Sequence, residues 1–157
     1  CSRDELLVQL AGSAGNQEEY EQIRQMAAKC PYEVRFLGRL SQPELAKIYR
    51  ESDIFVLPSF FDGLPLTVIE ALACRNRVVM SDLPGIRKWL MEAAPHGDVR
   101  FVEMPQMRNT DEPVLETLPA FEERFADALL ASIRTNERKA ADVSRISWEG
   151  IADRVLA

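Results

Sequence analysis

Apolar runs of strand length alternate with segments of helical period along most of this chain. The strand-length runs lie at 6–10, 34–37, 54–57, 77–80 and 99–102. The segments with helical period lie at 17–29, 42–51, 65–74 and 84–91. Strands that alternate with helices in this way form βαβ units, in which helices cover both faces of a parallel sheet. The pattern therefore predicts an α/β fold with a Rossmann-like parallel sheet.

Two of the predicted helices are preceded by start signals. Asn16 stands before the first helix and is followed three residues later by Glu19, and Ser41 before the second helix is followed by Glu44 in the same way. The side chain of such a capping residue accepts a hydrogen bond from a first-turn amide, and the later acid accepts one from the capping residue. Both pairs favour helices that begin just after them.

The carboxyl-terminal third has a different pattern. Residues 103–119 contain three prolines and are of mixed polarity, which predicts a long loop. An apolar stripe predicts a helix over 120–136, and a last helix is expected to begin near Ser147. We therefore expect residues 1–157 to form one domain, with closing helices over 120–157. The stripe comprises Phe121, Phe125, Leu129 and Ile133.

The composition argues against some classes of binding partner and favours one cellular compartment. The net charge of −6 over 157 residues argues against a nucleic-acid backbone as the main partner, because such proteins need a surplus of Lys and Arg. The three cysteines, Cys1, Cys30 and Cys74, lack metal-ligand spacing. Cys30 and Cys74 end helix-like segments and are expected to be buried free thiols, which favours a reducing cytoplasm. No apolar run approaches the length of a membrane span, and no signal peptide is present. Because the first residue is Cys and not Met, we expect a piece of a longer protein.

The predicted topology places a ligand site before any motif is considered. Open parallel sheets bind ligands beyond the carboxyl ends of their strands. One of these ends is the segment 58–63, which contains Asp62 and feeds the helix that carries Glu70. These two residues are the only acids between 58 and 74.

Glu70 is surrounded by apolar neighbours on its helix. A helix that is apolar on all sides is buried, and a carboxylate on it must find hydrogen-bond donors. The hydroxyl groups of a ligand in a cleft are one source of donors; local backbone amides, Arg75 or Arg77 are the alternative. The apolar neighbours are Leu66, Val68, Ile69, Ala71, Leu72 and Ala73.

Asp62 stands at the start of the same helix and also has two interpretations. An acid in this position interacts favourably with the positive end of the helix dipole and can cap the helix. The same helix start offers free backbone amides that bind anions, and Gly63 lets a bulky ligand approach the main chain closely. A phosphate bound there, with an acid at its edge, suits a sugar diphosphate.

Three stretches resemble a known family. The segment "LPSFFDGLPLTVIEALACRNRVVMSDLPGI" is similar to the carboxyl-terminal signature of group 1 (family 4) retaining glycosyltransferases of GT-B fold, in which an acid and a later Glu are separated by seven residues. The segment "VRFLGRLSQPELAKIYRESDIFVLPS" resembles the strand, helix and strand that precede this signature. The segment "ISWEGIADRVL" is similar to the closing helix of the family, so the resemblance covers roughly residues 5–102 and 120–157. It implies the carboxyl-terminal, donor-binding half of a GT-B enzyme.

The resemblance implies a role for each matching residue. Glu70 matches the acid that receives the ribose hydroxyls of a nucleotide-sugar donor, and Asp62 matches the acid that meets the donor sugar near its reacting carbon. Arg39 and Leu40 match the turn that recognises the base. The family retains anomeric configuration and generally needs no metal, so no cofactor is expected beyond the donor. The backbone amides that match those near the sugar and diphosphate belong to Gly63, Leu64, Leu66 and Thr67.

Several departures from the family pattern limit this transfer. Asp62 replaces the usual Glu, and the sequence "CRNR" at 74–77 replaces Cys-Gly-x-Pro. Lys88 stands where an acid often follows the Gly turn, and residues 103–119 exceed the usual link. The family's first strand of this domain, with its phosphate-binding cations, is missing, as is the amino-terminal acceptor domain. We therefore expect this chain alone to bind donor weakly and to catalyse nothing.

Two other functions are compatible with the sequence. A non-catalytic nucleotide-binding or interaction domain of flavodoxin type explains the same alternation but leaves Glu70 unexplained. A sugar-nucleotide epimerase of GT-B architecture needs further acid–base residues, and the single histidine, His96, lies in a turn composition. Partners implied by the leading hypothesis are the nucleotide-sugar donor and an acceptor domain of the same parent chain. Such enzymes can attach peripherally to a membrane, although no segment here predicts it.

Overall fold

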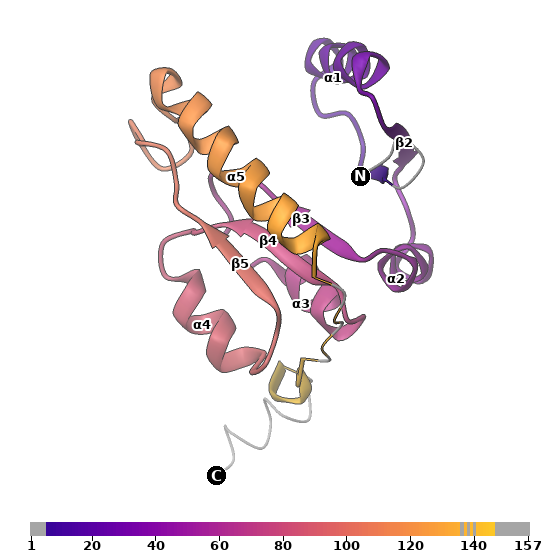
Figure 1. Ribbon diagram of the computed structural model, residues 1–157, viewed down its shortest axis with the longest axis vertical. Helices are drawn as coiled ribbons and strands as arrows, with labels where there is room; N and C mark the ends of the chain where they lie inside the picture. The colour runs from indigo at the N-terminus through magenta and orange to yellow at the C-terminus, as the bar shows by residue number, and fades with distance from the viewer. Residues whose placement is uncertain (1–5, 136, 138, 140, 147–157) are drawn as a thin grey trace. The chain divides into compact units, whose positions relative to one another are not determined.

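The computed structural model describes residues 6–135, 137, 139 and 141–146. Strands and helices alternate within them, as expected of an α/β fold (Figure 1). The elements up to residue 102 are β1 (Leu7–Ala11), α1 (Gln17–Lys29), β2 (Glu33–Gly38), α2 (Gln42–Glu51), β3 (Ile54–Leu57), α3 (Leu66–Ala73), β4 (Arg77–Ser81), α4 (Ile86–Ala93) and β5 (Val99–Val102). They are followed by η1 (Leu115–Thr117), α5 (Leu118–Ile133) and η2 (Ser144–Ile146).

All strand pairs that the structure describes are parallel, and they form two sheets. One sheet pairs β1 with β2, and the other has the order β3–β4–β5. The chain correspondingly divides into two compact units, Cys1–Leu45 and Ala46–Ala157. The prediction of a parallel, Rossmann-like α/β architecture is confirmed.

The second unit is built on β4, whose residues are all buried. Val79 packs with Val102 of β5 and with Phe121 and Phe125 of α5. The neighbouring residues Val78 and Met80 point to the opposite face and are fully buried as well. A strand that is buried on both faces has a continuous run of apolar residues, and this run allowed β4 to be predicted from the sequence.

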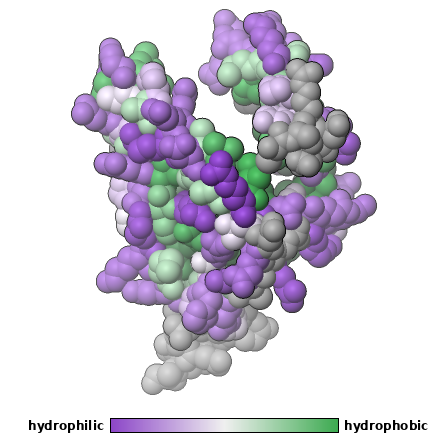
Figure 2. Space-filling view, viewed as in Figure 1, coloured by the Kyte–Doolittle hydropathy of each residue, from purple (hydrophilic) through white to green (hydrophobic). Residues whose placement is uncertain are grey.

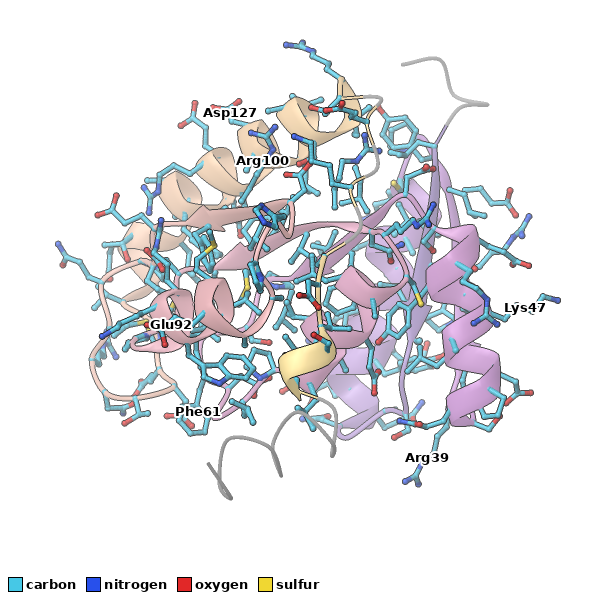
Figure 3. The ribbon with its side chains drawn as sticks, turned by 90° about the horizontal axis from the view of Figure 1, so that it is seen from below. Arg39, Lys47, Phe61, Glu92, Arg100 and Asp127 are labelled. Atoms are coloured by element: carbon cyan, nitrogen blue, oxygen red, sulfur yellow. The ribbon has the colours of Figure 1, made fainter. Side chains whose placement is uncertain are left out.

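Helix α5 follows the predicted stripe. Phe121 and Phe125 are buried, while Leu129 lies partly buried against the same cluster. Polar side chains cover most of the outer surface shown in Figure 2, and Asp127 of α5 points away from the sheet in Figure 3. The helix begins at Leu118 and ends at Ile133, so it is offset from the predicted 120–136.

The remaining differences from the expected elements are local. Helix α4 begins two residues later than predicted, because Gly85 adopts a left-handed conformation with φ of 79° before it. Residues 103–119 are not a plain loop: Met107 and Pro113 form an antiparallel bridge, and η1 follows. Cys30 and Cys74 are free but only partly buried. Cys1 and the helix expected near Ser147 lie outside the described residues.

Candidate functional site

Glu70 lies on α3, a helix with one side inserted into the core of the second unit and with Leu66, Thr67 and Ala73 exposed. Val68 and Leu72 of α3 are fully buried, and Ile69 and Ala71 are also buried. Glu70 itself is only partly buried. Its side therefore reaches a boundary of the core, where a carboxylate can keep its charge and accept hydrogen bonds.

The hydroxyl of Tyr49, near the end of α2, faces the Glu70 carboxylate. Tyr49 is 5% exposed, and its ring meets that of Phe55 edge-on with 5.7 Å between the centroids. Burial, followed by the charge of Glu70 and a hydrogen bond to it, raises the pKa of the Tyr49 hydroxyl to about 12. The hydroxyl thus stays protonated at neutral pH and can act as a donor to Glu70.

Asp62 stabilises the turn that leads into α3. Its Oδ1 accepts a hydrogen bond from the Leu64 amide at 3.0 Å, which is an Asx-type turn. The Leu66 amide donates to the Leu64 carbonyl at 2.8 Å. The resemblance assigns four amides to binding of the nucleotide sugar. Two of them, those of Leu64 and Leu66, therefore already form hydrogen bonds within the chain.

The other two amides have more open surroundings. Thr67 lies in the first turn of α3, where amides lack an intrahelical acceptor. Gly63 is exposed, and a β-carbon added there would meet no atom within 4 Å. Backbone at this turn is therefore open to close approach by a bulky group.

Arg39 and Leu40 belong to the first unit and follow the end of β2. Gly38 precedes them in a left-handed conformation with φ of 67°, and its carbonyl accepts from the Gly12 amide at 2.8 Å. Arg39 is exposed and projects from the ribbon (Figure 3), while Leu40 is partly buried. The predicted Ser41–Glu44 pair is formed, because the Glu44 carboxylate accepts from both the amide and the hydroxyl of Ser41, at 2.8 and 2.6 Å.

A largely apolar cavity of about 210 Å³ lies within the first unit, at the carboxyl ends of β1 and β2. The aromatic rings of Tyr20 and Phe36 meet in it edge-on, with 5.6 Å between their centroids. The cavity is lined by Leu10, Ala11, Gly12, Ser13, Tyr20, Ile23, Phe36 and Gly38. Ligands of open parallel sheets bind at such strand ends.

The structure also shows an ion pair that sequence reasoning missed. Asp82, directly after β4, pairs in bidentate fashion with Arg87 of α4, with Nε–Oδ1 and Nη2–Oδ2 distances of 3.0 and 2.5 Å. The Arg87 guanidinium lies 4.4 Å from the centre of the Phe101 ring. The hydrogen bond to Asp82 raises the pKa of Arg87. The spacing of five residues gives no signal for such a pair, because it spans a turn and not a regular helix.

The two arginines of the "CRNR" sequence have different environments. Arg75 is exposed and left-handed, with φ of 66°, at the end of α3. Arg77 at the start of β4 is 6% exposed, and its Nε and Nη1 atoms have no hydrogen-bond partner. His96 is exposed, as its turn composition predicts. Across the described part of the chain, no three His, Cys, Asp or Glu side chains gather as a metal site.

A known family matches most of the chain. The family model described as "Glycosyl transferases group 1" matches residues 2–99. This range contains Asp62, Glu70 and the turn with Arg39 and Leu40. It ends before the connection that leads to α5.

Curated relatives that match the chain are glycosyltransferases by name. The chain is 27% identical to a D-inositol 3-phosphate glycosyltransferase of Rhodococcus erythropolis, over 99% of its own length and 29% of the relative. It is 25% identical to a phosphatidyl-myo-inositol mannosyltransferase of Mycobacterium tuberculosis, over 87% of its length and 34% of the relative.

A shorter match has a higher identity. It is 42% over 52 residues, or 33% of this chain, with the N,N'-diacetylbacillosaminyl-diphospho-undecaprenol alpha-1,3-N-acetylgalactosaminyltransferase of Campylobacter jejuni, of which it covers 13%. The chain thus spans about a third or less of the length of these relatives. None of the helices in the described ranges is both long and apolar enough to cross a membrane.

Proposed function

Because this chain belongs to the group 1 glycosyltransferases, we propose that it is the donor-binding half of a retaining, metal-independent enzyme. Such an enzyme transfers a sugar from a nucleotide-diphosphate sugar to a glycan, lipid or small-molecule acceptor bound by an amino-terminal domain. The observation that carries this proposal is the partly buried Glu70 on the apolar helix α3. In the alternative, a flavodoxin-type interaction domain, Glu70 would have a structural role beside Tyr49.

Glu70 is proposed to receive the two ribose hydroxyls of the donor. A carboxylate offers about four acceptor positions, so it can bind two neighbouring hydroxyl groups while it keeps a contact with Tyr49. Its place at the edge of the core supports this role, because bonds to a charged acceptor are stronger there than in bulk water. Arg39 and Leu40 are proposed to recognise the base through main-chain groups.

Asp62 and the start of α3 are proposed to act on the reacting sugar and the leaving group. Breaking the glycosidic bond leaves negative charge on the diphosphate and positive charge on the sugar. Amides at Gly63 and Thr67, with the positive end of α3, would stabilise the diphosphate. The negative charge of Asp62 would orient the sugar and favour its cationic character. The amides of Leu64 and Leu66 would have to exchange their present partners to take part.

Titration of nucleoside diphosphates tests this proposal. UDP, GDP and ADP are each titrated against the full-length natural protein that contains this sequence, both as wild type and as the Glu70→Ala variant. We expect one of them to bind, and Glu70→Ala to weaken it by about 1–3 kcal/mol, because buried hydrogen bonds are lost.

Glu92→Ala provides the control, since it removes an exposed acid of α4. Its affinity should equal that of the wild type. Unchanged affinity of a folded Glu70→Ala protein would remove the ribose role and with it the proposal.

A further inference from the structure

Tyr49 is held at both its ring and its backbone. The ring is buried against Phe55, and the Tyr49 carbonyl accepts a hydrogen bond from Nδ2 of Asn76 at 2.6 Å. The same Nδ2 donates to the Ser52 carbonyl at 2.9 Å. Asn76 is 1% exposed, so this link between the end of α2 and the start of β4 is shielded from water. Tyr49 therefore presents its hydroxyl from a fixed position.

One face of α3 turns toward this hydroxyl. Glu70 and Cys74 are four residues apart, so they lie on the same side of the helix and its carboxyl-terminal cap. After burial, both contribute to the raised pKa of the Tyr49 hydroxyl, Glu70 through its charge and a hydrogen bond and Cys74 to a smaller extent. The contact with Glu70 therefore connects Tyr49, near the end of α2, with α3.

We infer that Tyr49 is a positioning residue, whose hydroxyl holds the Glu70 carboxylate in the orientation that receives the two ribose hydroxyls of the donor. This inference rests on the proposed function. Tyr49 does not touch the donor in this role and acts through Glu70.

A hydrogen-bond donor in a fixed position helps a carboxylate on a flexible side chain to bind a ligand. A glutamate that is free to rotate loses conformational entropy when a ligand orders it, and this loss weakens binding. The Tyr49 hydroxyl uses one acceptor position of the carboxylate and leaves the others for ligand. The raised pKa keeps the Tyr49 hydroxyl protonated at neutral pH, so it remains a hydrogen-bond donor there.

The test uses Tyr49→Phe, which removes the hydroxyl and keeps the ring that packs on Phe55. In the full-length natural protein, we expect Tyr49→Phe to weaken binding of the nucleoside diphosphate about three- to tenfold. In a Glu70→Ala background the same substitution should have no effect on affinity. A purely structural role would give the same loss in both backgrounds.

Tyr32→Phe is the matched control, because it removes a hydroxyl in the other unit. It should leave affinity unchanged, and the circular dichroism spectrum of Tyr49→Phe should show that this variant is folded. If Glu70→Ala weakens binding but Tyr49→Phe does not, or if the two losses simply add, the positioning role is wrong and the proposed function stands. If Glu70→Ala has no effect, the proposed function itself fails.

Discussion

The two acids of the segment 58–74 have different surroundings. Glu70 faces a tyrosine hydroxyl from within an apolar helix, and Asp62 bonds to the backbone of its own turn. The first arrangement fixes a side chain, whereas the second fixes a loop. The two residues should therefore respond differently to substitution.

Asp62→Asn separates the structural from the chemical role of Asp62. The amide oxygen of Asn can still accept from the Leu64 amide, so the turn should persist. The negative charge beside the reacting sugar is lost. We expect near-normal affinity for the nucleoside diphosphate but transfer reduced at least about a hundredfold, as when an electrostatic contact to a transition state is removed.

Steady-state kinetics and calorimetry on the full-length natural protein measure these two quantities. Asp111→Asn, an exposed acid in the connection before η1, serves as the control. A variant at Asp62 that turned over at the wild-type rate would remove its catalytic assignment.

The sequence predicts some of these side-chain environments but not others. Glu70 was conspicuous because a charge among apolar residues requires a partner. Tyr49 was not, since an apolar-faced helix accommodates a tyrosine without any special role. The capping alternative that the sequence left open is wrong, because α3 begins without a side-chain cap and Asp62 instead accepts from Leu64, one residue before the N-cap Pro65. Whether a ligand also uses Asp62 stays a prediction.

Among the helices, α3 ends with an arginine in a backbone conformation that favours glycine: Arg75 has a φ of 66°. The Arg75 amide donates to the Leu72 carbonyl and the Asn76 amide to the Ala71 carbonyl, both at 3.0 Å. These bonds form a Schellman motif, whose left-handed residue is usually glycine. Here that residue is Arg75, at the position where the resembled family has glycine.

Arg75→Gly should therefore stabilise the protein. Relief of the left-handed strain is worth about 1 kcal/mol, which for a chain of this size corresponds to about 2–4 °C in Tm. Arg75→Ala removes the same side chain but keeps the β-carbon, so it should give no such gain. Thermal unfolding of the three proteins measures this difference. Equal midpoints for the Gly and Ala variants would show that Arg75 is not strained.

Most elements could be predicted because local signals and burial agree. The Asn16 side chain accepts from the amides of Glu18 and Glu19, as the predicted cap requires. The start of α4 was misplaced, since the sequence does not reveal that Gly85 adopts a left-handed conformation. The bridge between Met107 and Pro113 was also missed, because it pairs single residues with no run of strand residues around them.

At the scale of the whole molecule, the sequence predicted the class of fold but not the pairing of its strands. Alternating elements require parallel strands and helices on their faces, and both are present. Which strands become neighbours depends on contacts between segments that are distant in the sequence. The local pattern therefore did not predict the separation into the sheets β1–β2 and β3–β4–β5. Of the residues proposed to bind the donor, Arg39 belongs to one unit and Glu70 to the other.

The central claim is that Glu70 binds the ribose hydroxyls of a nucleotide donor. The most direct measurement titrates the nucleoside diphosphate and its 2′,3′-dideoxy analogue against wild-type protein and Glu70→Ala. We expect loss of the hydroxyls to cost the wild type about tenfold or more in affinity, and to cost Glu70→Ala little. Equal binding of both ligands by the wild type, or an undiminished preference in Glu70→Ala, would contradict the claim.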